Sequence, residues 1–171
     1  TAAGLIKQLD SQDPAIVAKV LNKLEKVAGI KDLPAIVMAM SKADNQKLLQ
    51  EYVHFLSGVH VSQAPAVMVE LIANPVYAKI RAELVRACWE SNLDYSPHLL
   101  LFARLFIAGD YALALEAFSV IENTVQERPV NKKILAEILI LIKNNQPDQP
   151  EAMQKLGDEL IKILEPFVSD H

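Results

Sequence analysis

The chain has 171 residues, of which 51% are hydrophobic and only 5 are glycine, so it is too apolar to be disordered and has the length of one globular domain. Its formal net charge of −4 at pH 7 excludes a long-range attraction of the whole molecule for nucleic acid or anionic lipid. Threonine, which favours strands, occurs only as Thr1 and Thr124, whereas Leu, Ala, Lys and Glu are frequent. We therefore expect an all-α protein without a sheet.

Residues that begin or end helices recur at an interval of about 32 residues, as in a tandem repeat. Proline, which suits the first turn of a helix, recurs at Pro34, Pro65, Pro97 and Pro129. A second series consists of N-cap residues: Asp13, Asp44, Asn74, Asp110 and Asp148. A third series consists of residues that tolerate the left-handed conformation at helix ends: Gly29, Gly58, Asn92 and Asn123. The three series together predict a repeating unit of helix, turn, helix and turn.

Apolar residues at helical spacing predict ten helices arranged as five pairs within one domain, residues 1–171. In each pair a shorter helix precedes a longer one. The pairs span approximately residues 2–28, 33–57, 64–91, 97–124 and 129–167. The longer helices are expected at residues 14–28, 45–57, 75–91, 111–124 and 150–167.

The stretch from Leu99 to Ala108 is apolar on every side of a helix, with Arg104 as its only charged residue. Such a helix must be covered on more than one side. Ten helical residues span about 15 Å, roughly half of the hydrocarbon core of a bilayer, so we expect a buried helix and no membrane contact. An amphipathic hairpin cannot bury its apolar surface alone, and the neighbouring pairs are therefore expected to stack on it as an α-solenoid.

The stretch from Asn74 to Ala87 resembles the second helix of HEAT repeats, which opens with an Asp-Pro-like cap and carries Val-Arg followed by Ala. Residues 13–18 share the Asp-Pro opening but lack the arginine, and residues 109–117 share the cap and the alanines. The arginine of Ile80-Arg81 sits about one turn later than that pattern places it. The resemblance implies a right-handed α-solenoid of about five stacked antiparallel helix pairs (HEAT-like, armadillo-type) with an extended binding surface, and it carries over no catalytic residue.

Four residues of the third and fourth pairs are candidates for a partner surface: Arg81, Arg86, Trp89 and Tyr95. In HEAT-like repeats the matching arginine pairs with an acidic cap of the next unit, which here would be Asp110 or Asp94. Trp89 and Tyr95 beside Arg86 could form an aromatic interface anchor, and the alternative is that Trp89 packs against the next hairpin.

The remaining reactive residues form no recognisable site. The histidines His54, His60, His98 and His171 lack the close spacing of zinc ligands, and Cys88 lies on an apolar stripe, which favours a core position. Six residues separate Glu116 from Glu122, which places them about 120° apart on a helix and on different faces. We expect no catalytic residue, no metal and no cofactor.

These observations favour a non-catalytic protein-protein interaction scaffold that binds a peptide or a partner domain and resides in the cytoplasm. The alternative is a nucleic-acid-binding HEAT-like protein or a DNA glycosylase-like enzyme, and a small-molecule groove or a lyase-type activity on the same scaffold is a third possibility. The overall acidity disfavours nucleic acid. The basic residues available for it are Lys19, Lys23, Lys26, Lys79, Arg81 and Arg86.

Overall fold

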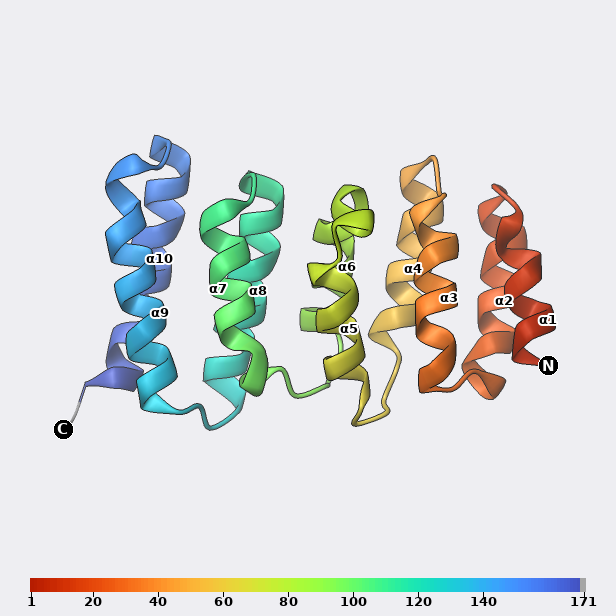
Figure 1. The fold of residues 1–171 in the computed structure, drawn as a ribbon, viewed down its shortest axis with the longest axis horizontal. Helices are drawn as coiled ribbons and strands as arrows, with labels where there is room; N and C mark the ends of the chain where they lie inside the picture. The colour runs from red at the N-terminus through yellow and green to blue at the C-terminus, as the bar shows by residue number, and fades with distance from the viewer. Residues whose placement is uncertain (170–171) are drawn as a thin grey trace. The chain divides into compact units, whose positions relative to one another are not determined.

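The computed structural model describes residues 1–169, which form ten α-helices and five short 3-10 helices and contain no strand. The prediction of an all-α protein is confirmed, and His171 lies outside the described residues. The chain divides into two compact units, Thr1–Leu93 and Asp94–His171. They correspond to the red-to-green and the green-to-blue parts of the ribbon in Figure 1. The single domain expected from the sequence stays a prediction.

Unit 1 contains the first three predicted helix pairs, and short 3-10 helices (η) adjoin several of their helices. Its elements are α1 (Ala2–Lys7), η1 (Gln8–Asp10), α2 (Pro14–Val27), η2 (Ile30–Asp32), α3 (Leu33–Ser41), α4 (Gln46–Ser57), α5 (Ala64–Ala73), η3 (Pro75–Ile80) and α6 (Arg81–Glu90). The first helices α1, α3 and α5 pack against one another in chain order, and the second helices α2, α4 and α6 do the same (Figure 1). The core of unit 1 therefore lies between these two rows.

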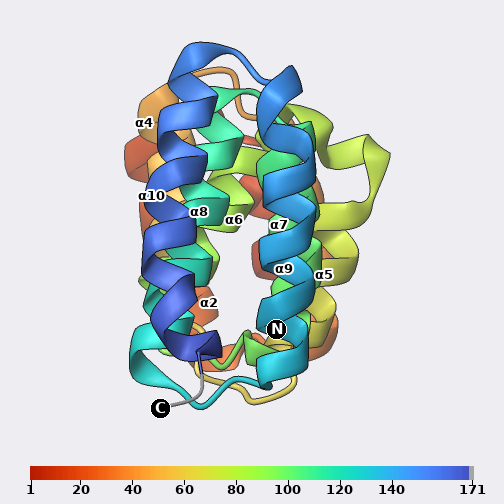
Figure 2. The same cartoon turned by 90° about the vertical axis from the view of Figure 1, so that its left-hand side faces the viewer.

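Unit 2 contains the last two pairs. Its elements are η4 (Ser96–His98), α7 (Leu99–Ala108), α8 (Tyr111–Glu127), α9 (Lys132–Asn145), η5 (Gln146–Asp148) and α10 (Glu151–Val168). Helix α7 packs against α8 and α9, and α10 packs against α8 and α9. The end-on view of Figure 2 shows α9 beside α7 and α10 beside α8. The second helix is the longer one in both pairs of unit 2, as predicted, whereas in the third pair of unit 1 α5 and α6 have 10 residues each.

Three of the five predicted N-cap residues are confirmed. The side chains of Asp13, Asn74 and Asp110 accept hydrogen bonds from backbone N–H groups of the turn that follows, at 2.9–3.0 Å. The other two predicted caps, Asp44 and Asp148, were wrong. Asn45 and not Asp44 caps α4, because its side chain accepts the Leu48 N–H at 2.9 Å.

The last pair differs from the prediction in the same way. Pro129 precedes the helix that it was expected to start, and Asn131 caps α9 by accepting the Lys133 N–H at 2.8 Å. Asp148 belongs to η5, and α10 begins after Pro150. Several adjacent residues in these loops can cap a helix, so composition alone does not select one of them.

The expected left-handed helix ends are absent from the described residues. None of them has a positive φ, and Gly29 and Gly58 have φ of −112° and −87°. Asn123 lies inside α8, which continues to Glu127. These helices end instead by passing directly into extended backbone or into a further turn of right-handed backbone.

The predicted helix over residues 75–91 is divided into η3 and α6. Tyr77 has φ −100° and ψ 16°, which interrupts the helical hydrogen bonding after the first turn. Tyr77 and Ile80 are nevertheless buried. The kink lets both side chains reach the core from a segment that opens with Asn74 and Pro75.

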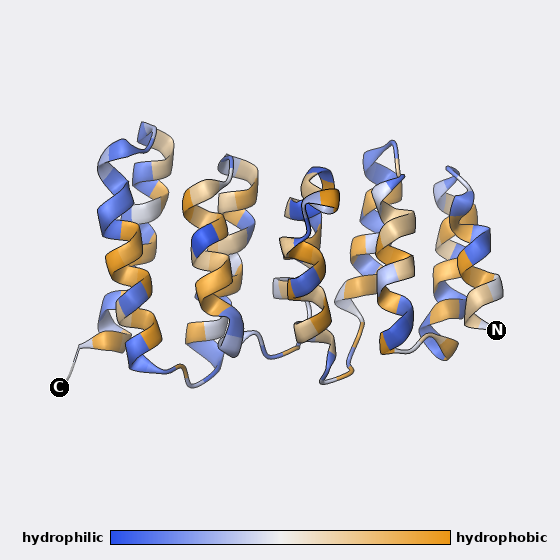
Figure 3. Ribbon diagram, in the orientation of Figure 1, coloured by the Kyte–Doolittle hydropathy of each residue, from blue (hydrophilic) through white to orange (hydrophobic). Residues whose placement is uncertain are grey.

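The apolar helix α7 buries one face completely, and most of its other apolar residues are half-buried, so the cover on more than one side that its composition predicts is only partial. Its ribbon is mostly orange in the hydropathy view of Figure 3. Leu99, Phe102, Ala103 and Phe106 are buried, whereas Arg104 is exposed. Among the described helices, each is too short or too polar to span a membrane.

Helix α2 shows where the expected apolar stripe exceeds what the packing covers. Val17 and Leu24 are fully buried, and Val20 and Leu21 of the same stripe are also buried. Ile16 and Val27 were also expected to face inward, but about half of each side chain is exposed. Both lie at the edge of the stripe, because α2 packs chiefly against α1 and α4.

Tyr52 of α4 is the largest fully buried side chain, and its hydroxyl donates a long hydrogen bond of 3.5 Å to the Leu9 carbonyl oxygen. Burial raises the pKa of Tyr52 from 10.0 to about 12. The unfolded chain therefore loses this proton at a lower pH than the folded chain does. Tyr52 contributes stability that is complete below pH 10 and is lost as the pH rises towards 12.

We expect the melting temperature of the protein to fall more between pH 8 and pH 11.5 than that of Tyr52→Phe. The two pKa units correspond to about 3 kcal/mol at most, and the measured difference will be smaller because pH 11.5 lies below the folded pKa. Circular dichroism melts at the two pH values measure it. An equal fall in both proteins would show that Tyr52 ionises as easily when folded as when unfolded.

We expect Gly109→Ala to destabilise the protein by about 1–3 kcal/mol, since added atoms in a packed turn force the backbone apart. Gly109 lies in the turn between α7 and α8, where a Cβ would be 2.8 Å from both the Leu105 carbonyl oxygen and a methyl of Leu113. Gly29→Ala is the control, because its nearest neighbour would be 3.9 Å away. Urea unfolding of both variants tests this, and equal stabilities would contradict it.

Candidate partner-binding surface

The four residues predicted to form a partner surface belong to different elements. Arg81, Arg86 and Trp89 lie on α6 of unit 1, whereas Tyr95 lies at the start of unit 2, before η4.

Arg81 binds backbone carbonyls of its own helix pair. Its Nε donates to the carbonyl oxygen of Ile72 at 2.7 Å, and one Nη donates to that of Asn74 at 3.2 Å. Both acceptors lie at the C-terminal end of α5, where helix carbonyls lack partners within the helix. The guanidinium thus holds α6 to the end of α5. The expected pairing of Arg81 with an acidic cap is replaced by these two bonds.

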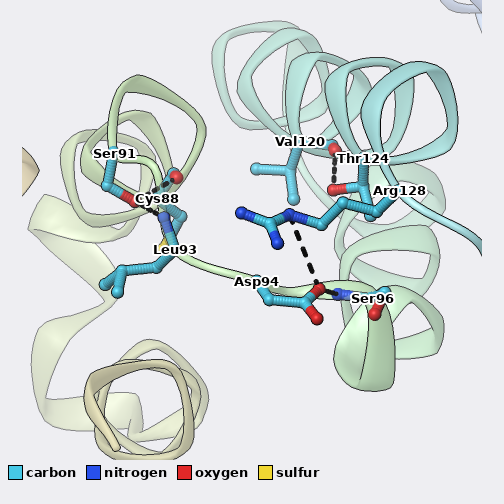
Figure 4. A network of polar contacts seen from close by, with 8 residues as sticks. All are labelled: Cys88, Ser91, Leu93, Asp94, Ser96, Val120, Thr124 and Arg128. Carbon is cyan, nitrogen blue, oxygen red and sulfur yellow. Dashed lines mark hydrogen bonds and ion pairs between the residues drawn. The ribbon is translucent and has the colours of Figure 1, made fainter. Parts of the chain in front are cut away.

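The two expected acidic partners of Arg81 are engaged inside unit 2. Asp110 caps α8. The side chain of Asp94 accepts the Ser96 N–H at 2.9 Å and lies 3.8 Å from Nε of Arg128 (Figure 4). The pKa of Asp94 is lowered mainly by hydrogen bonds from Ser96. The charges of Arg128 and His98 lower it further, whereas partial burial raises it. Asp94 thus joins the start of unit 2 to the end of α8.

Tyr95 belongs to the core of unit 2 and offers no surface. Only 3% of it is exposed, and its ring meets the ring of Phe102 edge-on, with centroids 5.8 Å apart and an interplanar angle of 86°. Arg86 and Trp89 are half-buried, and both already interact with other residues. The aromatic anchor expected from Trp89 and Tyr95 is therefore not an exposed pair.

The cysteine Cys88 lies where the sequence suggests. Cys88 is buried on α6, and its thiol lies 3.4 Å from the Leu84 carbonyl oxygen, which confirms a core position. Ser91, drawn beside it in Figure 4, donates to the Cys88 carbonyl oxygen at 2.8 Å. Within residues 1–169, no three His, Cys, Asp or Glu side chains are grouped so that they could hold a metal ion.

A cavity of about 540 Å³ opens in unit 1 between the C-terminal ends of α2 and α4. Its volume lies within the range of ligand pockets, roughly 300–1,000 Å³. The two helix ends and the loops that follow them form its walls. The lining residues are Leu24, Glu25, Ala28, Gly29, Ile30, Leu33, His54, Phe55, Ser57, Gly58, Val59, His60 and Val61.

The interior of this cavity is mainly apolar and its polar groups lie at the edge. Leu24, Leu33 and Phe55 are buried, whereas Glu25 and His54 are exposed. An apolar depression with a polar rim suits the insertion of an apolar side chain from a binding partner. We refer to this feature below as the α2–α4 cavity.

No protein-family model, curated protein or solved structure matches this chain. The interpretation of the surface therefore rests on its own geometry.

No pattern in the sequence predicted the α2–α4 cavity. Its only sequence signal is that both helices are followed by small and apolar residues, Ala28-Gly29-Ile30 after α2 and Gly58-Val59 after α4. Small residues leave space beside a helix end, but they show neither that two such ends meet nor how large the space is. The packing of α2 on α4 decides both.

We expect Arg81→Ala to lower the stability of the protein by about 1.5–3 kcal/mol, because two charge-assisted hydrogen bonds to α5 are lost. Arg81→Lys should restore only part of it, since one ammonium cannot reproduce the fork that reaches both carbonyls. Urea unfolding measures both variants. An unchanged stability of Arg81→Ala would rule out a structural role for these bonds.

Proposed function

We propose that this protein is a non-catalytic scaffold that binds a peptide or a partner protein through the surface of its second helices. Its architecture in this proposal is a right-handed α-solenoid of five stacked antiparallel helix pairs, similar to HEAT and armadillo-type repeats. The support is the packing within each unit, where α2, α4 and α6 follow one another and α10 follows α8. Such rows of helices offer extended surfaces for binding.

The observation that carries the proposal is the α2–α4 cavity. It lies between two second helices, and its lining is apolar inside and polar at the edge. Burying one aromatic or aliphatic side chain of a partner there would contribute about 1.5–3 kcal/mol, which is the contribution of a typical interface anchor. The proposed partner segment therefore carries a large apolar side chain.

The charge of the chain favours a protein partner over nucleic acid. The net charge is −4, and the exposed lysines of α2 (Lys19, Lys23 and Lys26) are a local exception. Duplex DNA binding requires several lysines or arginines that neutralise phosphates at once. Binding to DNA that weakens steeply with salt would therefore favour the nucleic-acid alternative over this proposal.

A peptide-display selection on the immobilised protein tests the proposed function. We expect the selected peptides to share one large apolar residue and to lose at least about tenfold in affinity for Val61→Asp, which places a charge at the edge of the cavity. Val76→Asp is the matched control, because Val76 is an exposed valine of the same unit on η3, outside the cavity lining. Fluorescence anisotropy measures the affinities.

Three results would contradict the proposal: a selection that enriches no peptide, equal losses for Val61→Asp and Val76→Asp, or catalytic turnover located at this surface. Circular dichroism spectra of both variants must match that of the parent protein. Both valines are exposed to solvent, so neither aspartate has to be buried in the core.

A further inference from the structure

Unit 2 exposes apolar side chains along one stripe of each of its second helices. On α8, Tyr111 and Leu115 are one helical turn apart and are 50% and 41% exposed. On α10, Leu156, Ile163 and Phe167 follow the same helical spacing; the first two are half-buried, and Phe167 is 40% exposed. We call these five residues the α8–α10 strip.

Helices α8 and α10 lie side by side and begin at the same end of unit 2. They pack directly against each other. The side chain of Gln149, just before α10, donates to the Ile107 carbonyl oxygen near the end of α7 at 3.2 Å. Since α8 begins only a few residues after Ile107, the starts of α8 and α10 are neighbours. The two stripes therefore run alongside each other.

The apolar stripe of α10 lies on the flank that faces α8. The opposite flank carries Glu165, which pairs with Lys143 of α9 at 3.2 Å, and Asp158, which accepts from the Gln146 side chain at 2.8 Å. The Lys143–Glu165 pair is exposed, so this flank points away from α7 and α8. The flank with Ile163 and its apolar neighbours lies on the other side of the buried residues of α10 and points towards α8.

The apolar stripe of α8 lies on the flank that faces α10. Because the buried Ala114, Ala117 and Ile121 of α8 match Gly157, Leu160 and Leu164 of α10 at a constant offset, the two helices can be compared position by position. Leu115 and Glu122 of α8 then correspond to Asp158 and Glu165 of α10. In the stacked arrangement this flank points towards the following pair, which for α8 is the pair containing α10.

The charges beside the strip are predominantly negative. Of the three acidic residues of α8, Glu122 lies two turns after Leu115 on the same stripe, whereas Glu116 is buried and Glu127 lies on a different face of the helix. The two lysines of α10 are each paired with a carboxylate of the preceding turn, Lys155 with Glu151 at 3.5 Å and Lys162 with Glu159 at 3.4 Å. Unit 2 carries twelve Asp or Glu against seven Lys or Arg, a net charge of −5.

We propose that the α8–α10 strip binds an amphipathic helix of a partner protein that carries basic residues beside its apolar face. An amphipathic helix commonly binds with its apolar face on an apolar strip between two helices. Carboxylates near the strip favour lysine or arginine at the flanks of the bound helix. This inference rests on the proposed scaffold function and adds a second contact region with a stated partner chemistry.

Two designed helical peptides with the same Leu and Phe face, one with lysine and one with glutamate at the flanks, test the inference. We expect the full chain to bind the lysine peptide at least about tenfold more tightly, with a preference that shrinks as salt is raised. Glu122→Gln should reduce the preference, because it removes one carboxylate beside the strip. Fluorescence anisotropy of labelled peptides gives the dissociation constants.

Leu115→Ser should weaken binding of the lysine peptide at least about fivefold, since it removes apolar contact area from the strip. The matched control is Ile140→Ser, because Ile140 is an apolar residue of the same unit, is 60% exposed and lies on α9, outside the strip. Circular dichroism melts of both variants establish that they fold. Both side chains are exposed, so neither substitution opens a core cavity.

The inference is overturned if the two peptides bind equally, if neither binds, or if Ile140→Ser weakens binding as much as Leu115→Ser does. It is also overturned if sedimentation shows a dimer that Leu115→Ser dissociates, because the occupant of the strip is then a second copy of the chain. Val61→Asp should leave the lysine peptide unaffected. If only the lysine peptide fails while display-selected peptides still depend on Val61, the scaffold function stands without this contact.

Discussion

Apolar contact between successive second helices is the interaction on which each unit depends. A hairpin of two amphipathic helices leaves one side of its apolar surface in water, and this surface becomes buried only when the next hairpin covers it. Tyr52 of α4 shows the consequence, because it is fully buried and its hydroxyl reaches back to the Leu9 carbonyl oxygen of the preceding pair. In unit 2, the packing of α7 on both α8 and α9 has the same effect. Within each unit, the apolar surface of one helix pair is therefore buried by contact with the next pair.

Polar groups in this fold serve mainly to end helices and to join them. Asp13 and Asp110 cap the second helices, Arg81 binds the free carbonyls at the end of α5, and Gln149 connects the start of α10 to the end of α7. Each bond is made at a helix end, where backbone groups lack a partner within the helix. The two surfaces proposed to bind partners, the α2–α4 cavity and the α8–α10 strip, are instead places where apolar side chains stay partly uncovered.

The sequence by itself determined the secondary structure almost completely. The ten helices were predictable because apolar residues repeat at helical spacing and because Asp, Asn and Pro mark most of the helix starts. Local chemistry decides both features. The prediction failed where several local choices are equivalent, as at Asp44 and Asn45, or where tertiary contacts outweigh local preference, as at Tyr77, whose burial accompanies the division of one expected helix into two.

Only the tertiary structure decided which of the candidate residues are available for binding. Arg81 and Tyr95 were selected for their chemistry. In the structure, Arg81 donates its hydrogen bonds to carbonyls at the end of α5, and Tyr95 packs against the ring of Phe102. Ile16 and Val27 belong to a predicted buried stripe, yet they stay exposed because no described helix covers that edge of α2. The α2–α4 cavity had no clear signal in the sequence, since its volume arises from two helix ends about thirty residues apart. Periodicity records which face of a helix is apolar, whereas the packing of one helix on another decides how much of that face is covered.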